Sequence, residues 1–268
     1  MTVSRWERAG TYLVLVLFAG YALYPVGWIL LTALRSDTAG QGGWHPENFV
    51  TAWTQGRFGD YLGTSVLVAV AVVGLATLLS VLAGYAFGTM RFRGADLLFY
   101  VLLLGVTIPS QAVVVPLYFD LRDLGLTDTY AALVLPQVAQ SVAFGAFWMR
   151  AYFRASSTSV VEAARLDGAG HWQILWRVLL PMGRPAVLTL MVLVFMWTWN
   201  EFLLALVMVT DEGLRTAPLG LRFFQGRATT SVPLLAAGSV LVALPVVVLY
   251  LFLQRHFIRG MLDGAVKG

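Results

Sequence analysis

Cysteine is absent from the 268-residue chain, and lysine occurs once, as Lys267. Without cysteine there is no disulfide framework, thiol nucleophile or cysteine-ligated metal site. The one lysine lies in Gly-Ala-Val-Lys-Gly, so the phosphate-binding motif G-x-x-x-x-G-K-[ST] is missing and the chain supplies no ATP site of that kind. Charged residues are scarce as well, at 12% against 59% hydrophobic residues. This composition predicts an integral membrane protein.

Patterns typical of catalysis or nucleic-acid binding are also missing. His45, His171 and His256 are far apart in the sequence and are predicted on different sides of the membrane, which argues against a shared metal site. No G-x-S-x-G motif or carboxylate pair lies at the end of a predicted span. The basic residues form no patch interleaved with aromatics. We therefore expect no enzyme, no metal, no cofactor bound by this chain and no nucleic-acid partner.

The apolar residues gather into six segments, each long enough at about 20 residues or more to cross a hydrocarbon core of ~30 Å. The first is too long for the apolar region of a secretory signal and is expected to be retained. We expect an all-α integral membrane protein of one domain, residues 1–268, with spans at Thr11–Leu34, Tyr61–Phe87, Leu97–Tyr118, Tyr130–Met149, Pro185–Val209 and Leu234–Leu253.

Arginine and lysine sort by membrane side. With the N-terminus inside, twelve of the 18 basic residues fall on the inner side and six on the outer side. An excess of basic residues marks cytoplasmic loops. Both termini, the tail of residues 254–268 and the loop of residues 156–181 are therefore expected to be cytoplasmic.

The loop of residues 156–181 is moderately polar and predicts a helix–turn–helix. Ser159 and Glu162 have the spacing of a capping box, in which each side chain binds the other residue's backbone amide. Gly168 is expected to end this first helix, because glycine readily adopts the left-handed backbone found at helix C-termini.

A second helix is predicted at His171–Leu180. Its apolar residues recur at spacings of three and four, which is typical of an amphipathic helix. Pro181 is expected to end it, since proline cannot continue the backbone hydrogen-bond ladder.

The loop resembles the EAA loop of the membrane subunits of bacterial ABC importers. That pattern reads E-A-A, three residues, G, nine residues, I, one residue, L-P, and here the spacing holds with Val178 in place of the usual Ile. In that family the loop is the coupling helix that docks into a cleft on the ATP-binding subunit. The resemblance implies coupling to an ATPase through Glu162, Ala163, Ala164, Asp167, Gly168 and Pro181.

Further stretches are similar to the maltose-type carbohydrate uptake family of ABC permeases, in particular to the smaller of its two membrane subunits. They are HPENFVTAW before the second span, WNEFLLALVM in the fifth, RTAPLGLRFFQG after it, and the terminal Gly-Ala-Val-Lys-Gly. The resemblance covers nearly the whole chain. It implies the six-helix fold of type I ABC importer permeases.

The same resemblance implies a set of partners in a bacterial cytoplasmic membrane. They are a second homologous permease, two copies of an ATP-binding cassette subunit that hold ATP and Mg, and an extracellular solute-binding protein or lipoprotein. The substrate would be a sugar, carried through the paired bundles by alternating access. The sequence does not identify the sugar.

Polar residues at membrane depth are the candidates for lining a pathway. The third span is interrupted by Pro109 and Pro116, the fourth by Pro136, and interrupted helices often line substrate paths. A packing kink whose polar groups bind a neighbouring helix is an equal alternative. The candidates are Ser110, Gln111, Gln137, Gln140, Asn200 and Glu201.

Glu201 is the acidic residue predicted well inside a span, where an ionised carboxylate costs at least ~2.5–3.5 kcal/mol. It should face protein or water, either in the pathway or paired with a partner subunit. A rival reading is an ion- or proton-driven secondary transporter that uses Glu201, but no internal repeat supports it. A purely structural scaffold subunit would leave the EAA-type loop unexplained.

Overall fold

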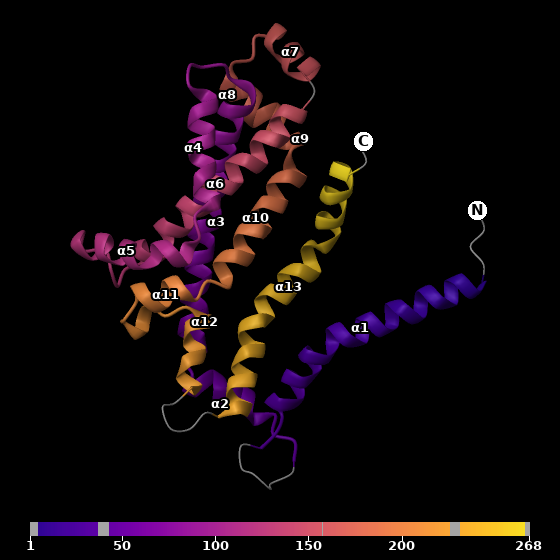
Figure 1. Cartoon of the computed structure of the whole chain (residues 1–268), viewed down its shortest axis with the longest axis vertical. Coiled ribbons are helices and arrows are strands. Elements are labelled where there is room, and N and C mark those ends of the chain that lie inside the picture. The colour runs from indigo at the N-terminus through magenta and orange to yellow at the C-terminus, as the bar shows by residue number, and fades with distance from the viewer. Residues whose placement is uncertain (1–4, 37–42, 157, 226–230, 266–268) are drawn as a thin grey trace. The chain divides into compact units, whose positions relative to one another are not determined.

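The computed structural model describes residues 5–36, 43–156, 158–225 and 231–265, and only the backbone of the last helix beyond residue 252. The described residues form helices joined by short turns, without a β-strand (Figure 1). The expected all-α class is confirmed.

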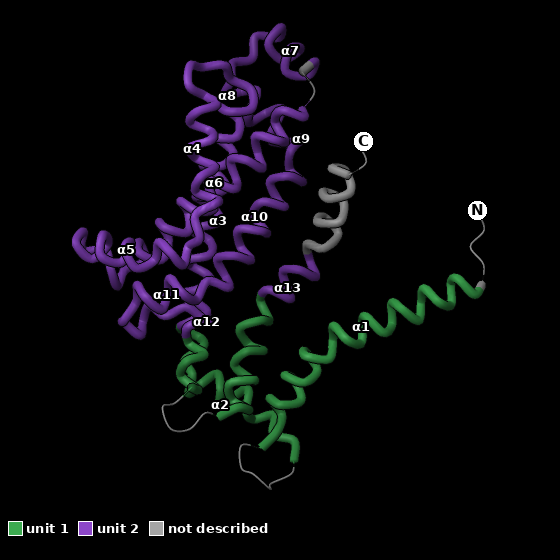
Figure 2. Tube along the Cα trace, in the orientation of Figure 1, with its two compact units in different colours: residues 1–60, 220–245 green, residues 61–219, 246–268 purple. Residues whose placement is uncertain are grey.

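The chain divides into two compact units (Figure 2). Unit 1 comprises residues 1–60 and 220–245, and unit 2 comprises residues 61–219 and 246–268. The functional candidates described below all lie in unit 2, where the helices are α3 Phe58–Thr89, α4 Ala95–Thr107, α5 Ser110–Asp123, α6 Tyr130–Ala155, α7 Thr158–Leu166, α8 His171–Gln173, η1 Ile174–Leu179, α9 Leu180–Met182, α10 Arg184–Trp199, α11 Leu203–Met208, η2 Glu212–Leu214 and α12 Ala217–Gly220.

Unit 1 joins the first helix to the segment before α3. Its elements are α1 Arg5–Ala33, α2 Glu47–Gln55, η3 Leu221–Phe224 and the first part of α13 Val232–Ala265. The Asn48 side-chain amide donates to the carbonyls of Ala33 at 2.9 Å and Arg35 at 2.8 Å. These carbonyls lie at the end of α1 and would otherwise have no partner within the helix. Phe58 and Phe224 stack with ring centroids 6.2 Å apart.

Close approach of α3 and α6 organises unit 2. A Cβ at Gly84 would lie 2.4 Å from Met149 Cβ and 2.9 Å from the backbone nitrogen of Arg150, and one at Gly88 would lie 2.9 Å from Phe153 Cβ. Gly74, earlier in α3, has nothing within 4 Å of its Cβ position. The Gly84–Gly88 pair therefore serves helix packing, because small residues let helix backbones approach.

The predicted third span, Leu97–Tyr118, is not one straight helix. It consists of α4 and α5, bent by 99° at a break after Thr107. Pro109 is extended, with φ −66° and ψ 129°, and its ring removes a backbone donor, so the α4 ladder cannot pass through it. Pro116, in contrast, lies inside α5 without ending it. The helix α5 continues through Pro116 to Asp123.

The predicted fifth span, Pro185–Val209, is interrupted too. The helix α10 ends at Trp199, and α11 begins only at Leu203. The amide of Glu201 binds the carbonyl of Thr198 at 3.2 Å, which tightens the last turn and closes the helix. Glu201 is therefore at a helix break and not within a continuous span.

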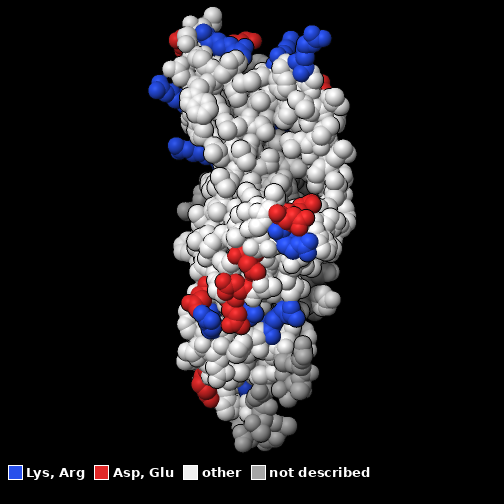
Figure 3. All heavy atoms as spheres, turned by 90° about the vertical axis from the view of Figure 1, so that its left-hand side faces the viewer, with Lys and Arg blue, Asp and Glu red and all other residues white. Residues whose placement is uncertain are grey.

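Length and composition allow four described helices to cross a membrane: Trp6–Ala33, Phe58–Thr89, Tyr130–Ala155 and Val232–Phe252. The number rises to six if each of two bent pairs counts as one span; the second pair is His171–Met182 with Arg184–Trp199, bent by 80°. In Figure 3 the charged side chains of unit 2 gather toward the end that carries α7 and α8, and again at the level of α5 and α11. The uncharged surface between them suits a hydrocarbon environment.

Candidate functional site

The helix α7 and the turn that follows it present most of the predicted coupling residues to solvent. Glu162, Ala163, Asp167 and Gly168 are exposed, and the apolar side chain of Leu166 is 89% exposed. On the opposite side of the helix, Val161 and Ala164 pack against the core of the unit. The segment thus presents two acidic side chains, Glu162 and Asp167, and one large apolar side chain, Leu166, at its surface.

Glycine closes α7 as predicted. Gly168 has φ +80°, its amide binds the carbonyl of Arg165 at 3.0 Å, and the amide of Ala169 binds the carbonyl of Ala164 at 2.9 Å. This bond pattern is a Schellman motif, in which a left-handed residue turns the chain back over the last carbonyls.

The predicted capping box at Ser159 is wrong. The helix α7 begins at Thr158, so Ser159 lies within its first turn and cannot be the residue that precedes it. A comparable contact occurs at the next helix, where the Gln173 side chain accepts from the amide of Gly170 at 3.1 Å. The side-chain cap is therefore found at the start of the second helix of the pair, at Gly170 and Gln173.

The second helix differs from its prediction, because it continues through Pro181 to Met182. It contains a π-helical stretch, η1, in which the amide of Leu180 binds the carbonyl of Leu175. A π turn is wider than an α turn and is often found at functional sites. The wider turn accommodates the proline ring, which would clash with the carbonyl four residues earlier in a regular α-helix. The stop falls at Gly183 instead.

Two tyrosines anchor this second helix to the bundle. The hydroxyl of Tyr85 on α3 lies 3.1 Å from Nδ1 and 3.2 Å from the carbonyl of His171. The hydroxyl of Tyr152 on α6 donates to the carbonyl of Leu179 at 3.1 Å, and its ring lies against Gly183. Ile174, Leu175 and Leu179 are each 1% exposed. The helix that follows α7 is therefore fixed to both α3 and α6.

Arg150 ties together the ends of three helices nearby. Its guanidinium donates from Nη2 to Asp96 Oδ1 at 3.1 Å and from Nε to the carbonyl of Phe87 at 3.3 Å, and lies 3.6 Å from the ring centroid of Phe99. The side chain is only 12% exposed. A cation over an aromatic face adds to the ion pair when it is shielded from water. This contact joins α3, α4 and α6 beside the helix pair.

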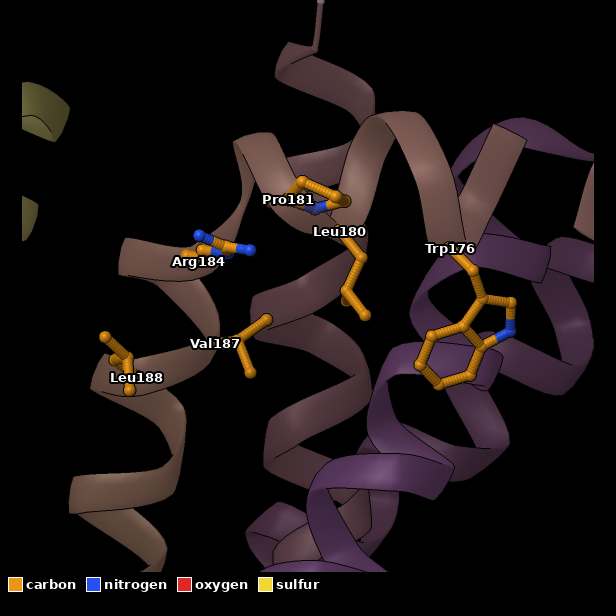
Figure 4. A pocket seen from close by; sticks show the side chains of 6 residues that line it. All are labelled: Trp176, Leu180, Pro181, Arg184, Val187 and Leu188. Atoms are coloured by element: carbon orange, nitrogen blue, oxygen red, sulfur yellow. The ribbon is translucent and has the colours of Figure 1, made fainter. Parts of the chain in front are cut away.

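A hollow of about 340 Å³ lies at the bend between α9 and α10 (Figure 4). Its walls are mostly apolar and carry one cation, that of Arg184; the lining residues are Trp176, Leu180, Pro181, Arg184, Val187 and Leu188. Pro181 thus lies at the edge of a cavity and not at the exposed surface of α7.

The two helix breaks form a second region, with hollows of about 350 and 590 Å³. Ser110, Gln137, Gln140 and Glu201 line both hollows, Gln111 lines the first and Asn200 the second. The structure thus brings together all six pathway candidates, from α5, α6 and the segment after α10.

Several of these polar side chains are bound locally. Gln137 donates from Nε2 to the carbonyl of Leu133 at 2.7 Å, and Asn200 donates from Nδ2 to the carbonyl of Met196 at 2.7 Å. Glu201 Oε1 accepts from the amide of Leu204 at 2.7 Å and so caps the start of α11. The Glu201 bond satisfies an amide in the first turn of α11, which has no partner within the helix.

Hydrogen bonds to Asp128 fix the loop after α11. Asp128, at φ +55°, accepts from the hydroxyl and amide of Thr210 and from the amide of Asp211. These bonds to the charged form hold the pKa of Asp128 below its usual value, the Thr210 hydroxyl contributing most. Within the described ranges, no group of three or more His, Cys, Asp or Glu could hold a metal ion.

Sequence reasoning missed Tyr85, Arg150 and Tyr152 as organising residues. Their partners lie 86, 54 and 27 positions away, so no local spacing marks them. The only signal was the position of Arg150 at the end of an apolar run, which we used for orientation alone.

Comparison with known proteins gives a consistent result. Residues 76–263 match the family model described as "Binding-protein-dependent transport system inner membrane component". The chain is 36% identical over 252 residues to the probable ABC transporter permease protein YurM of Bacillus subtilis, covering 91% of this chain and 84% of that protein. It is 33% identical over 271 residues to the trehalose transport system permease protein SugB of Mycobacterium tuberculosis, covering 97% and 99%.

The fold also matches solved structures. A chain of a bacterial ABC transporter involved in the import of the acidic polysaccharide alginate aligns with a TM-score of 0.80 at 24% identity, covering 96% of this chain and 99% of that one. A chain from an alginate transporter in complex with a periplasmic protein that holds an alginate pentasaccharide aligns with a TM-score of 0.70 at 16% identity, covering 92% of each.

Proposed function

The chain belongs to the family of binding-protein-dependent transport system inner membrane components, and from this premise we propose that it is one permease subunit of an ATP-driven sugar importer. It would form half of a pathway for a disaccharide or oligosaccharide. Relatives at 30% and 33% identity are named for diacetylchitobiose and trehalose uptake, which supports this substrate class.

The main support for a coupling role is that α7 is exposed while the helix that follows it is anchored to the bundle. The helix α7 offers Glu162, Ala163, Asp167 and the exposed Leu166 to a partner, while the next helix is bonded to α3 and α6. A force applied to α7 would then move the bundle, because a packed helix passes on a displacement that a flexible loop would absorb.

The remaining coupling residues shape the loop and do not offer side chains. Gly168 permits the turn after α7, and Ala164 packs inward. Pro181 lies in the second helix and would act through the bend into α10. The partner on α7 would be an ATP-binding cassette subunit, present in two copies that hold ATP and Mg, while this chain binds no cofactor and hydrolyses nothing.

The six polar residues at the helix breaks would line the pathway. Ser110, Gln137, Gln140 and Glu201 line both hollows there, and broken helices at a substrate path are common in transporters. A second homologous permease would complete the wall, and the two bundles would alternate between inward- and outward-facing states. An extracellular solute-binding protein would deliver the sugar.

The proposed location is a bacterial cytoplasmic membrane with both termini inside. Under this orientation the end that carries α7 and Arg150 is cytoplasmic, and the η2 loop is external. The family description as an inner membrane component supports the location, and the excess of arginine supports the orientation.

The test is co-purification of the tagged chain from its host in mild detergent, with mass spectrometry of its partners. We expect a P-loop ATPase and a second permease. Leu166→Arg should lose the ATPase and keep the permease, because a charge would enter an apolar contact. Leu124→Arg is the matched control, since Leu124 is also largely exposed, at 71%, but lies in the turn after α5.

A lone chain or homodimer that moved solute under a proton gradient would overturn the proposal in favour of a secondary transporter. Retention of the ATPase by the Leu166→Arg variant would remove α7 from the interface and leave the importer itself standing.

A further inference from the structure

We propose that the hollows at the two helix breaks select uncharged saccharides and reject acidic ones, with Glu201 as the residue that determines this preference. The inference rests on the proposed function, in which these hollows lie on a sugar pathway. It adds the charge class of the substrate, which neither the fold nor the family specifies.

The first argument comes from the ionisable groups. The described residues that line the two hollows include one carboxylate, that of Glu201, and no lysine, arginine or histidine. An anionic substrate would therefore meet a like charge with no cation to offset it. Like charges brought together away from bulk water repel strongly, and this is a common means of rejecting a wrong ligand.

The second argument comes from hydrogen bonds that are already made. Gln137 and Asn200 each use a side-chain N–H on a backbone carbonyl. A carbonyl can accept only from the NH₂ group, so these bonds also fix which end of each amide is the oxygen. One N–H of each of these two amides is therefore used within the protein, and the two amide oxygens remain as acceptors.

Glu201 adds to the same bias. Its Oε1 accepts from the amide of Leu204, and within the described part of the chain Oε2 has no hydrogen-bond donor. The lining therefore offers the Glu201 carboxylate and the two amide oxygens as acceptors to a sugar. Sugar hydroxyls can donate to such acceptors, whereas a carboxylate, phosphate or sulfate ester group offers only acceptors in return.

The third argument is the aromatic wall of the larger hollow. Phe144 and Trp197 meet edge to face, with ring centroids 5.0 Å apart and planes at 79°. Both rings line that hollow, beside Asn200 and Glu201. Aromatic faces present apolar surface to the C–H face of a pyranose while nearby polar groups orient it. The combination suits an uncharged sugar ring.

The test uses matched pairs of probes. The assembled complex and its binding protein are reconstituted in liposomes, and ATP-dependent uptake is measured for trehalose, maltose and cellobiose and for the derivative of each in which one CH₂OH is oxidised to a carboxylate. The measured quantity is the ratio of kcat/KM for the neutral sugar to that for its acidic counterpart. The binding protein is the same throughout, so its own selectivity cancels between variants.

For the wild-type complex we expect a ratio of about ten or more in favour of the neutral sugar that it transports. Glu201→Gln keeps the acceptor for the Leu204 amide and removes the charge. It should lower the ratio by roughly fivefold, chiefly by raising uptake of the acidic sugar. Glu212→Gln is the matched control, since it removes a carboxylate that lies outside both hollows, and it should leave the ratio unchanged.

Gln140→Lys provides a second variant should Glu201→Gln fail to assemble. Gln140 is exposed and lines both hollows, and the added cation should lower the ratio in the same direction. An unchanged ratio in both variants would overturn the inference while leaving the sugar importer intact. A wild-type complex that imports no saccharide at all would remove the proposed function itself.

Discussion

The α7–α9 helix pair and the break between α10 and α11 both interrupt regular helix, but different contacts hold them in place. At the helix pair, bonds from distant parts of the chain fix the irregular stretch: Tyr85 reaches from α3 and Tyr152 from α6. At the break, Asn200 and Glu201 satisfy the backbone within four residues of their own position.

The difference separates two tasks. A stretch fixed by long-range contacts moves with the helices that hold it, so it suits the transmission of a displacement. A stretch satisfied by local bonds leaves the side chains around it available to a ligand. Variants at the first region should therefore affect assembly and coupling, and variants at the second should affect substrate preference.

The largest expected effect comes from the α3–α6 contact beneath the helix pair. Gly84→Ala places a Cβ 2.4 Å from Met149 Cβ and 2.9 Å from backbone. Such overpacking should cost roughly 1–3 kcal/mol or more and reduce the yield of assembled complex. The measurement is thermal stability followed by size-exclusion chromatography in detergent.

Gly74→Ala is the matched control in the same helix, because nothing lies within 4 Å of its Cβ position. It should be neutral or slightly stabilising, by up to ~1 kcal/mol on helix propensity. Equal behaviour of the two variants would mean that α3 and α6 do not depend on close approach.

The next effect concerns the turn after α7. Gly168→Ala forces a side chain into a backbone at φ +80°, at a cost of about 1–2 kcal/mol, and should reduce uptake by around tenfold through a misplaced α7. Gly170→Ala should be tolerated, since Gly170 has φ −74° and open space around it. Uptake assays with equal membrane insertion check the pair, and normal uptake in Gly168→Ala would remove the coupling role.

A smaller effect is expected at the anchor of the second helix. Tyr152→Phe removes the hydrogen bond to the Leu179 carbonyl, worth about 1 kcal/mol, and keeps the ring against Gly183. We expect more ATP hydrolysed per sugar imported, because the helix pair keeps Tyr85 but loses the hydrogen bond from the second of its two anchoring tyrosines. Tyr130→Phe, a partly exposed site at the other end of α6, should leave that stoichiometry unchanged.

The smallest effect lies at the loop after α11. Hydrogen bonds to the charged carboxylate lower the pKa of Asp128 in the folded chain. The ionised Asp128 therefore contributes fully to the free energy of unfolding at pH values above the pKa of the unfolded chain, about 3.9, and this contribution is lost as the pH falls through the lower pKa of the folded chain. Asp128→Asn keeps a residue that tolerates φ +55°. The variant should be less stable near pH 7 by under about 1 kcal/mol, since the site is exposed.

Thermal unfolding of both proteins between pH 7 and pH 3 checks this prediction. The difference in unfolding temperature between the wild-type protein and the Asp128→Asn variant should shrink as the pH falls below 4. A difference that stays constant with pH would mean that the aspartate charge is not what pins the loop.

The features that could be predicted from the sequence are determined by residues close together in the chain. The turn at Gly168 follows from glycine at the end of a helix. The six pathway candidates were chosen as polar residues among apolar ones; the structure gathers them around shared hollows, and their role in a pathway stays a prediction.

The features that it missed depend on distant parts of the chain or on the wider geometry of one turn. No spacing rule pairs Arg150 with Asp96 or Tyr152 with Leu179. The passage of the second helix through Pro181 depends on a π turn, which residue propensities do not register. A kink was expected at Pro109, but the residue pattern does not predict the 99° angle of the bend.

The π turn has a consequence for the motif itself. A spacing counted in residues becomes an angle around the helix axis, and one residue corresponds to about 100° in an α-helix. The π stretch takes up an additional residue without advancing that angle in the ordinary way. Deleting a single residue from Ile174–Leu179 would therefore let the stretch return to α-helix while α7 and Pro181 keep nearly the same relative orientation. The π turn thus lets the interval between Gly168 and Pro181 hold one residue more than a regular α-helix would at that orientation.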